Sequence, residues 1–287
     1  MVRRACAALA LIAAVAASAP PAAHAYGSPR VAALQVTLRA RGFYGGTIDG
    51  VRGPRTVRAV RAFQRRAGLV ADGIVGPRTR TALGRFARRR IGARPMWPGM
   101  RGWDVAALQF MLAWHGFPSG AMDGYFGSRT HRALYRYQRW KRIGADGVAG
   151  PLTLRSLRSP PPRPPVSLSR PVGGGIGDRF GPRGNRFHTG LDFSAWYGAR
   201  VRAARSGRVA YAGWDSGGYG YLVIVRHGHG IRTWYAHLSR ISVGFGQRVG
   251  RGARVGAVGA SGHATGPHLH FELRVRGAAV NPLSALR

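Results

Sequence analysis

The chain has 287 residues and a formal net charge of +36, carried almost entirely by arginine. With 45% hydrophobic and 10% aromatic residues it can build hydrophobic cores, which excludes a wholly disordered protein, and its length allows more than one domain. Only nine acidic residues accompany 45 basic ones, a balance that favours a polyanionic partner over a surface that is merely solvated.

Residues 1–25 have the three-part pattern of a secretory signal peptide. Two arginines near the N-terminus supply the positive region, residues 7–17 form an apolar run, and an Ala-His-Ala triplet supplies small residues at the cleavage site. The apolar run is shorter than the roughly 20 residues that a membrane span needs, and no later apolar segment approaches that length. We therefore expect a secreted protein with no transmembrane segment. Its only cysteine, Cys6, lies inside the signal, so the mature protein is expected to hold no disulfide.

Export decides which polyanions such a basic protein can meet. Nucleic acid is the usual partner of a strongly basic chain, but an exported protein meets cell-wall polymers and anionic lipid headgroups instead. We therefore expect no nucleic-acid partner and charge-driven contact with the cell wall or with lipid headgroups. We expect the protein to be a monomer.

An internal repeat organises the first half of the chain. Residues 31–83 align without a gap to residues 105–157, and both copies open on Val-Ala-Ala-Leu-Gln, carry two Asp-Gly pairs and close on Gly-Pro. Apolar residues recur every three or four positions in the first copy, which predicts amphipathic helices, and the closing proline suits the first turn of a third, short helix. We therefore expect two small three-helix modules, at residues 27–86 and 100–158.

The combined pattern L-Q-x-x-L-x-x-x-G-F, D-G-x-x-G-x-x-T, F/Y-Q and D-G-x-x-G-P-x-T resembles the peptidoglycan-binding domain 1 family. This resemblance covers both copies and implies non-catalytic modules that bind bacterial peptidoglycan. A helix-turn-helix DNA-binding domain is the alternative for short basic helices, and the expected export argues against it. The repeated residues themselves are expected to be turn formers and core.

A proline-rich and then glycine-rich stretch, residues 159–175, predicts a linker after the second copy. Residues 176–287 form the next domain. Glycine becomes frequent there, and short β-branched or aromatic runs alternate with turns, which predicts an all-β domain. The clearest runs are Arg208–Ala212, Tyr221–His227, Thr233–His237 and His268–Val275.

The last of these runs alternates polar and apolar residues. In a strand, alternate side chains share a face, so His268, His270 and Glu272 are expected on one face and the intervening apolar residues in the core. Two imidazoles that project together from one strand pack poorly, but they suit a metal site. This spacing does not decide which of the two histidines binds the metal.

A second segment, His188-Thr-Gly-Leu-Asp192, supplies an imidazole and a carboxylate within five residues. Gly190 is expected to let the backbone bend between them. Catalytic zinc takes three protein ligands from histidine and carboxylate, so one histidine of the last strand would complete the set. The other histidine and His237 are then candidate proton carriers or oxyanion stabilisers. The remaining histidines of this domain, His227, His229 and His263, are expected to be structural.

From residue 177 to 283 the chain resembles the M23 peptidases, the lysostaphin- and LytM-like endopeptidases. The matching motifs are G-D-R-F-G-P-R, H-x-x-x-D, V-x-A-A-x-S-G-x-V, G-Y-G-Y-L-V-I-V-x-H, Y-A-H-L-S and T-G-P-H-L-H-F-E. Together they span the whole domain. The family folds as a largely antiparallel β domain with an open groove over the metal.

By position, the resemblance implies that His188, Asp192 and His270 bind Zn²⁺ and that His237 and His268 are the catalytic pair. The resulting hypothesis is a secreted zinc metalloendopeptidase that hydrolyses peptide bonds of bacterial peptidoglycan and is anchored to the wall by its two modules. One alternative is a catalytically inactive or latent LytM-like regulator of cell-wall amidases. Another is a purely adhesive wall binder driven by charge.

Overall fold

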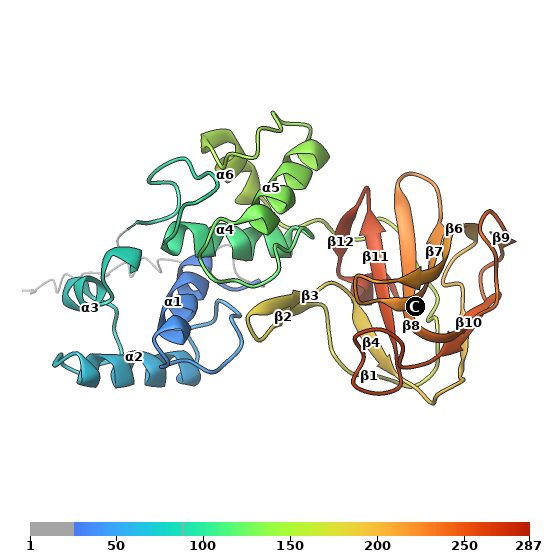
Figure 1. Ribbon diagram of the computed structural model, residues 1–287, viewed down its shortest axis with the longest axis horizontal. Coiled ribbons are helices and arrows are strands. Elements are labelled where there is room, and N and C mark those ends of the chain that lie inside the picture. The colour runs from blue at the N-terminus through green and yellow to red at the C-terminus, as the bar shows by residue number, and fades with distance from the viewer. Residues whose placement is uncertain (1–25, 88) are drawn as a thin grey trace, which may run out of the picture.

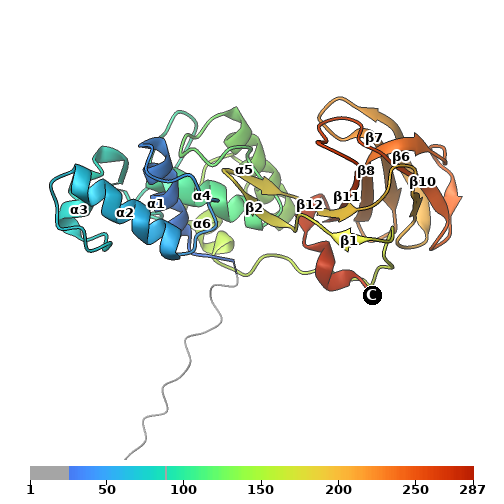
Figure 2. The same cartoon turned by 90° about the horizontal axis from the view of Figure 1, so that it is seen from below.

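The computed structural model describes residues 26–87 and 89–287. The expected signal peptide and Cys6 lie outside these residues. The described chain divides into an α-helical half, up to residue 158, and a β half that follows it, as Figures 1 and 2 show. This agrees with the expected fold class of two three-helix modules followed by a largely antiparallel β domain. Among the described residues, no helix has the length and apolarity that crossing a membrane requires.

Each copy of the repeat folds into three helices, and all three later helices have a counterpart in the first copy. Proline occupies the first turn of four of the six helices, where a missing N–H costs no hydrogen bond. The helices are α1 Pro29–Ala40, α2 Pro54–Arg66, α3 Pro77–Ala82, α4 Trp103–Trp114, α5 Ser128–Lys141 and α6 Pro151–Leu157, with a short 3₁₀ turn, η1 Arg85–Ala87, between the copies.

Four buried glutamines hold the turns of the helical half, two in each copy. In the first, Gln35 Nε2 donates to Asp49 Oδ1 at 2.7 Å and to Thr56 Oγ1 at 3.1 Å, while the Gly50 N–H donates to Gln35 Oε1 at 2.9 Å. We call this arrangement the Gln–Asp–Gly clasp. The other three clasps repeat the same contacts around Gln64 and Asp72, Gln109 and Asp123, and Gln138 and Asp146. The Asp-Gly pairs are therefore turns, as expected, and each is tied to the helix before it.

The two copies pack on each other through α1 and α4. Small and apolar residues from both helices share one core, among them Ala32, Val36, Ala106 and Phe110. The Trp103 indole N–H also donates to the Thr37 hydroxyl across this contact. Since α4 must cover α1 on one side and its own module on the other, it is buried over nearly its whole length, Asp104 through Ala113. The two modules therefore form one helical body.

The β half is built on an antiparallel sheet. Within the described residues this sheet has ten strands, and its central path runs β1-β4-β11-β8-β7-β6-β9, while β2 and β3 form a separate hairpin. The strands are β1 Gly175–Ile176, β2 Gly181–Arg183, β3 Arg186–His188, β4 Leu191–Ser194, β5 Arg200–Arg202, β6 Gly207–Asp215, β7 Gly220–Arg226, β8 Ile231–Ile241, β9 Arg248–Val249, β10 Arg254–Val258, β11 His268–Val275 and β12 Ala278–Val280. A 3₁₀ turn, η2 Pro282–Ala285, ends the fold.

The second part of the segment expected to be a linker, residues 159–175, packs onto the β half. Leu168 and Val172 are buried in the core of the sheet. Leu168 also accepts and donates backbone hydrogen bonds at the C-terminal end of the chain, for example from its N–H to the Ala285 carbonyl at 2.8 Å. Apolar side chains among the prolines and glycines give this part a place in the core.

The β2–β3 hairpin reaches from the β half to the helical half (Figure 1). At its tip the Gly184 carbonyl accepts from the Ile48 N–H of the first module at 2.8 Å, and the Asn185 carbonyl accepts from the Met122 N–H of the second at 2.7 Å. Behind the tip, the ring of Trp114 packs edge-on against Phe187 with centroids 5.1 Å apart. Both modules therefore hold the hairpin whose last residue is His188.

Candidate metal centre and active site

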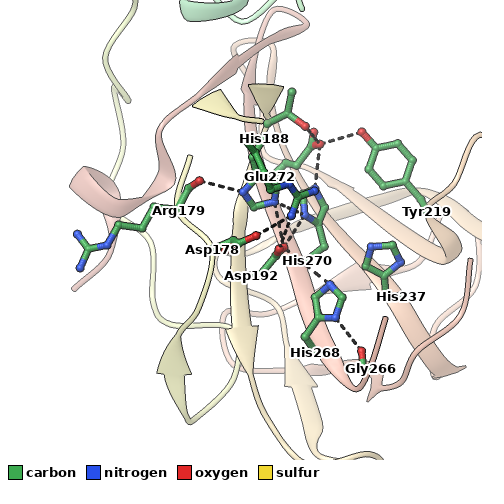
Figure 3. Close-up of polar contacts among 12 residues, drawn as sticks. Asp178, Arg179, His188, Asp192, Tyr219, His237, Gly266, His268, His270 and Glu272 are labelled. Atoms are coloured by element: carbon green, nitrogen blue, oxygen red, sulfur yellow. Dashed lines mark hydrogen bonds and ion pairs between the residues drawn. The ribbon is translucent and has the colours of Figure 1, made fainter. Parts of the chain in front are cut away.

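Strand β11 carries the polar face that the alternation predicted. Leu269, Phe271 and Leu273 are fully buried in the core of the sheet, so the opposite face presents the two histidines and Glu272. Strand β11 pairs with β4 on one side and with β8 on the other, and the register sets His270 directly opposite Asp192. The sheet thus places an imidazole and a carboxylate side by side (Figure 3).

Three side chains from three strands converge at this point. His188 Nε2 lies 3.0 Å from His270 Nδ1 and 3.1 Å from Asp192 Oδ1, and His270 Nδ1 lies 2.8 Å from the same oxygen. His188 and His270 are almost completely buried. Among the described residues, this is the only group of histidine, cysteine, aspartate or glutamate side chains with the spacing of a metal site.

In both metal-site histidines the ring nitrogen that points away from the cluster makes a hydrogen bond, and this bond sets which nitrogen of the ring carries the proton. His188 Nδ1 lies 3.0 Å from the Arg179 carbonyl oxygen, and His270 Nε2 lies 3.1 Å from Glu272 Oε1. Both partners only accept hydrogen bonds, so each outer nitrogen carries the proton and each inner nitrogen faces the cluster with a lone pair. Three atoms that can accept then meet at one point, where either a proton or a cation lies between them. Such a donor set fits a divalent cation.

The electrostatics of the cluster agree with this geometry. Burial alone would raise the pKa of Asp192, but its hydrogen bonds to His188 and His270 lower that pKa well below its usual range. Burial alone would lower the pKa of His270, but the carboxylates of Asp192 and Glu272 raise it to about 9. The site therefore attracts positive charge, and a bound cation would take the place of a proton.

The sequence pattern placed Glu272 on the polar face of its strand but did not predict a role for it. In the structure its carboxylate holds the His270 ring in place. It is completely buried and accepts from Thr189 Oγ1 at 2.5 Å, from Tyr219 Oη at 2.8 Å and from Arg274 Nε at 2.6 Å. Burial would raise its pKa, but the Arg274 guanidinium and the contact with His270 keep that pKa well below its usual range. A permanently ionised Glu272 thus fixes the orientation of the His270 ring. The signal in the sequence was that this residue is the only glutamate of the chain.

The two remaining histidines lie beside the cluster (Figure 3). Their rings are 4.8 Å apart, and His268 Nε2 is 3.9 Å from Asp192 Oδ1. His237 donates from Nδ1 to the Ser261 carbonyl at 2.8 Å and His268 from Nδ1 to the Gly266 carbonyl at 2.8 Å. Burial lowers the pKa of His237 to about 4, so this imidazole is neutral and its Nε2 is a free base at neutral pH.

The chain bends at Gly190, as expected, but the bend does not depend on a backbone conformation reserved for glycine. Gly190 is absent from the described glycines with positive φ, so any residue could adopt its backbone conformation. What it provides is room, because a Cβ at this position would lie 2.4 Å from the Phe271 carbonyl oxygen and 2.9 Å from the His270 ring. The glycine thus lets the segment that joins the two ligand strands pass directly over β11.

The other histidines of the β half stay away from the cluster. His227 is held by the Ser206 carbonyl at 2.9 Å and by Thr233 Oγ1 at 2.7 Å, and His229 occupies a turn with φ +46°. His263 is exposed and adjoins Gly218. None of the three belongs to the metal cluster, and the contacts of His227 and the turn at His229 agree with the structural roles expected for these two.

A groove of about 780 Å³ opens beside strand β4, close to His268. Ser194, which pairs with His268 in the sheet, forms part of its wall together with Pro267. Trp196 and Tyr197 also line it, and their side chains are 89% and 67% exposed. Aromatic rings exposed to this degree beside a candidate catalytic histidine are suited to contact an extended substrate.

Comparison with known protein families gives one match in the β half and two in the helical half. The family described as "Peptidase family M23" matches residues 186–282. The description "Putative peptidoglycan binding domain" matches residues 27–83 and 101–157.

Several curated proteins are similar to part of this chain. The DD-carboxypeptidase/endopeptidase Mpg of Neisseria meningitidis is 48% identical over 99 residues, which cover 34% of this chain and 23% of that protein. An uncharacterized metalloprotease of Haemophilus influenzae is 36% identical over 166 residues, 58% of this chain and 33% of that protein. The peptidoglycan DD-endopeptidase ShyA of Vibrio cholerae is 43% identical over 104 residues, 34% of this chain and 23% of that protein. The chain thus spans about a quarter to a third of the length of these relatives.

Among solved structures, the catalytic domain of the antimicrobial peptidase lysostaphin from Staphylococcus simulans is 33% identical. The match covers 39% of this chain and 90% of that one, with a TM-score of 0.37.

Proposed function

The C-terminal domain of this chain belongs to peptidase family M23 and follows two peptidoglycan-binding domains, and from this premise we propose a secreted zinc endopeptidase that cleaves peptide bonds of bacterial peptidoglycan. The observation that carries the proposal is the convergence of three acceptor atoms, from His188, Asp192 and His270, at one buried point. The names of the relatives, a DD-carboxypeptidase/endopeptidase and a DD-endopeptidase, support peptidoglycan as the substrate class.

His188, Asp192 and His270 would hold the metal, and their nitrogen and oxygen donors are those that zinc prefers in catalytic sites. A zinc ion bound there supplies Lewis-acid chemistry, activating water and polarising the scissile carbonyl. Glu272 and the Arg179 carbonyl keep the two imidazoles in the tautomer that this requires. These outer contacts hold the ligands in place before a cation arrives.

His237 and His268 would move the protons of the reaction. Each donates from Nδ1 to a backbone carbonyl, which leaves Nε2 to accept a proton from the attacking water and to return it to the departing amine. The imidazolium that forms transiently also stabilises negative charge on the carbonyl oxygen of the substrate. All five residues of the expected set are present, so the donor set gives no support to an inactive regulator.

The two helical modules would keep the enzyme on its insoluble substrate. Tethering raises the concentration of peptide bonds around the active site without adding contacts inside it. Peptidoglycan-acting relatives and the two binding domains support a location at the cell wall or in the periplasm.

The test is a set of single substitutions assayed on purified cell walls. His188→Ala should abolish zinc binding and the release of peptide fragments, while the variant still sediments with the wall. His268→Ala should retain zinc and lose activity by about a hundredfold or more, the usual contribution of a general acid–base group. His263→Ala, at an exposed histidine outside the cluster, is the matched control and should behave as the wild type. Wall cleavage by His188→Ala at the wild-type rate would refute the proposal.

A further inference from the structure

The first module carries a basic groove that the active site does not use. It measures about 660 Å³ and lies between α2 and the loop that follows α1. Phe43, Tyr44, Ala59 and Ala62 provide apolar walls. Four arginines of α2 line it as well: Arg55, Arg58, Arg61 and Arg65.

These arginines are exposed and lie along one stripe of the helix, spaced by three or four residues. Among the described residues, none of them takes part in an ion pair or donates a hydrogen bond from its side chain. The two aspartates of this module, Asp49 and Asp72, accept hydrogen bonds within their own clasps. The guanidinium groups therefore repel one another, and an anionic ligand would remove that repulsion.

The second module has a related groove, but the β half closes part of it. Phe117 and Arg139 line this groove at the repeat positions of Phe43 and Arg65. Here the wall also includes Arg276 and Gly277, from the turn that joins β11 to β12.

The contacts that seat this turn are specific. The Trp140 indole N–H donates to the Val275 carbonyl at 3.1 Å, and the Arg276 guanidinium lies 5.4 Å from the Trp140 ring. Gly116 lies against β12, where a Cβ would approach the Ala279 carbonyl oxygen to 2.2 Å. The Ala279 N–H donates to the Gly116 carbonyl at 3.2 Å. The second module is thus occupied by its own peptidase domain on the side where the first module remains open.

We propose that the two modules divide their work: the α2 groove of the first binds carboxylate groups of the peptidoglycan peptides, and the second is the seat of the peptidase domain. This inference rests on the proposed function for its substrate class. Arginine forks bind carboxylates through paired hydrogen bonds, and the apolar walls suit the peptide that bears them. Both modules contact the β2–β3 hairpin, so the groove is joined to the half of the chain that carries the metal site.

Two double variants of the full chain test the division. Arg58→Ala with Arg65→Ala removes two charges from the open groove. Arg132→Ala with Arg139→Ala removes two exposed charges at the same repeat positions of the second module. Alanine is a strong helix former, so both pairs should fold, which circular dichroism checks.

Sedimentation with purified peptidoglycan at about 150 mM salt measures binding, because long-range charge attraction is largely screened there. The first pair should bind about tenfold to a hundredfold more weakly and the second pair within about twofold of the wild type. Equal losses in both pairs would show that charge alone drives binding and would overturn the proposal. So would a larger loss in the second pair.

The chemistry of the ligand is tested on the wall itself. Blocking the peptide carboxylates with methylamine and a carbodiimide should weaken wild-type binding to the level of the first pair. Removing phosphate-bearing polymers by acid extraction should leave binding unchanged. The reverse result would assign the groove to phosphate and overturn the carboxylate assignment.

Hydrolysis of a soluble peptidoglycan fragment separates this inference from the proposed function. Both pairs should cleave it as the wild type does. If the wild type cleaves no fragment but the groove variants lose binding, the proposed function fails and the division stands. If cleavage is seen and all variants bind equally, the division fails alone.

Discussion

The helical half and the β half each bury a polar cluster, and the two clusters differ in how their hydrogen bonds are balanced. In a Gln–Asp–Gly clasp the glutamine amide donates to the aspartate and threonine and accepts from the glycine N–H, so donors face acceptors throughout. In the β half, Asp192 and the inner nitrogens of two histidines bring three atoms that can accept to one point, and only a proton separates them when no cation is bound. The clasp is complete within the chain, whereas the second cluster takes a proton or a cation from outside.

This difference separates structural polar groups from functional ones. A balanced cluster contributes its full stabilisation as soon as the chain folds, because no buried atom is left without a partner. An unbalanced cluster costs stability until its ligand binds, and proteins retain such costs at functional sites. Zinc should therefore stabilise the β half alone, whereas the loss of a clasp glutamine should destabilise the helical half with or without zinc.

The largest expected effect is the response of the β half to zinc. At a free concentration about a thousandfold above the dissociation constant, bound zinc should stabilise this half by about 4 kcal/mol. Hydrogen exchange measured by mass spectrometry should show the gain in β4 and β11 and none in α1 or α4. His188→Ala should cancel the gain. An equal gain in the helical half, or in this variant, would contradict the contrast between the two clusters.

Acid should destabilise the helical half through His115. This side chain is buried beside the Leu157 carbonyl, and burial lowers its pKa from 6.5 to about 4. Above pH 6.5 the imidazole is neutral in both the folded and the unfolded chain, so its contribution is fully present. As the pH falls from 6.5 to 4, the unfolded chain binds the proton first, and about 3 kcal/mol should be lost.

Urea unfolding at a series of pH values measures this loss, followed by hydrogen exchange in the second module. His115→Gln should flatten the dependence between pH 6.5 and 4. A slope that persists unchanged in this variant would assign the acid sensitivity to another group.

The smallest of the three effects is the loss of one clasp. Gln138→Ala leaves the Gly147 N–H and the Val148 carbonyl without their buried partner and should destabilise the second module by about 2 kcal/mol. Zinc affinity should not change, because the clasp shares no atom with the metal cluster. Gln247→Ala, at a glutamine in an exposed turn of the β half, serves as control and should cost less than about 0.5 kcal/mol. If both substitutions cost the same, the clasp is not the structural unit inferred from the contacts.

The internal repeat shows which structural features can be predicted from local sequence patterns. Spacing in the sequence predicted the helices, the Asp-Gly turns and the proline at the start of α3, because each depends on residues within one or two turns of chain. The sequence showed that the clasp glutamines recur at equivalent positions of the repeat, but it did not indicate their role. Their role depends on bringing Gln35 against a turn 14 residues away, which no local pattern specifies.

By itself the sequence determined that His268, His270 and Glu272 share one strand face, that two helical modules precede an antiparallel β domain, and, through resemblance, which five residues are candidates for the active site. Only the tertiary structure brought His270 opposite Asp192, showed Glu272 to be the buried anchor of the His270 ring, and set Gly190 over β11 as a matter of room. It also placed the His188 hairpin against both modules and left one groove open where the β half partly covers its counterpart. The reason is that faces and turns follow from neighbours along the chain, whereas register, burial and docking depend on residues that meet only when the chain is folded.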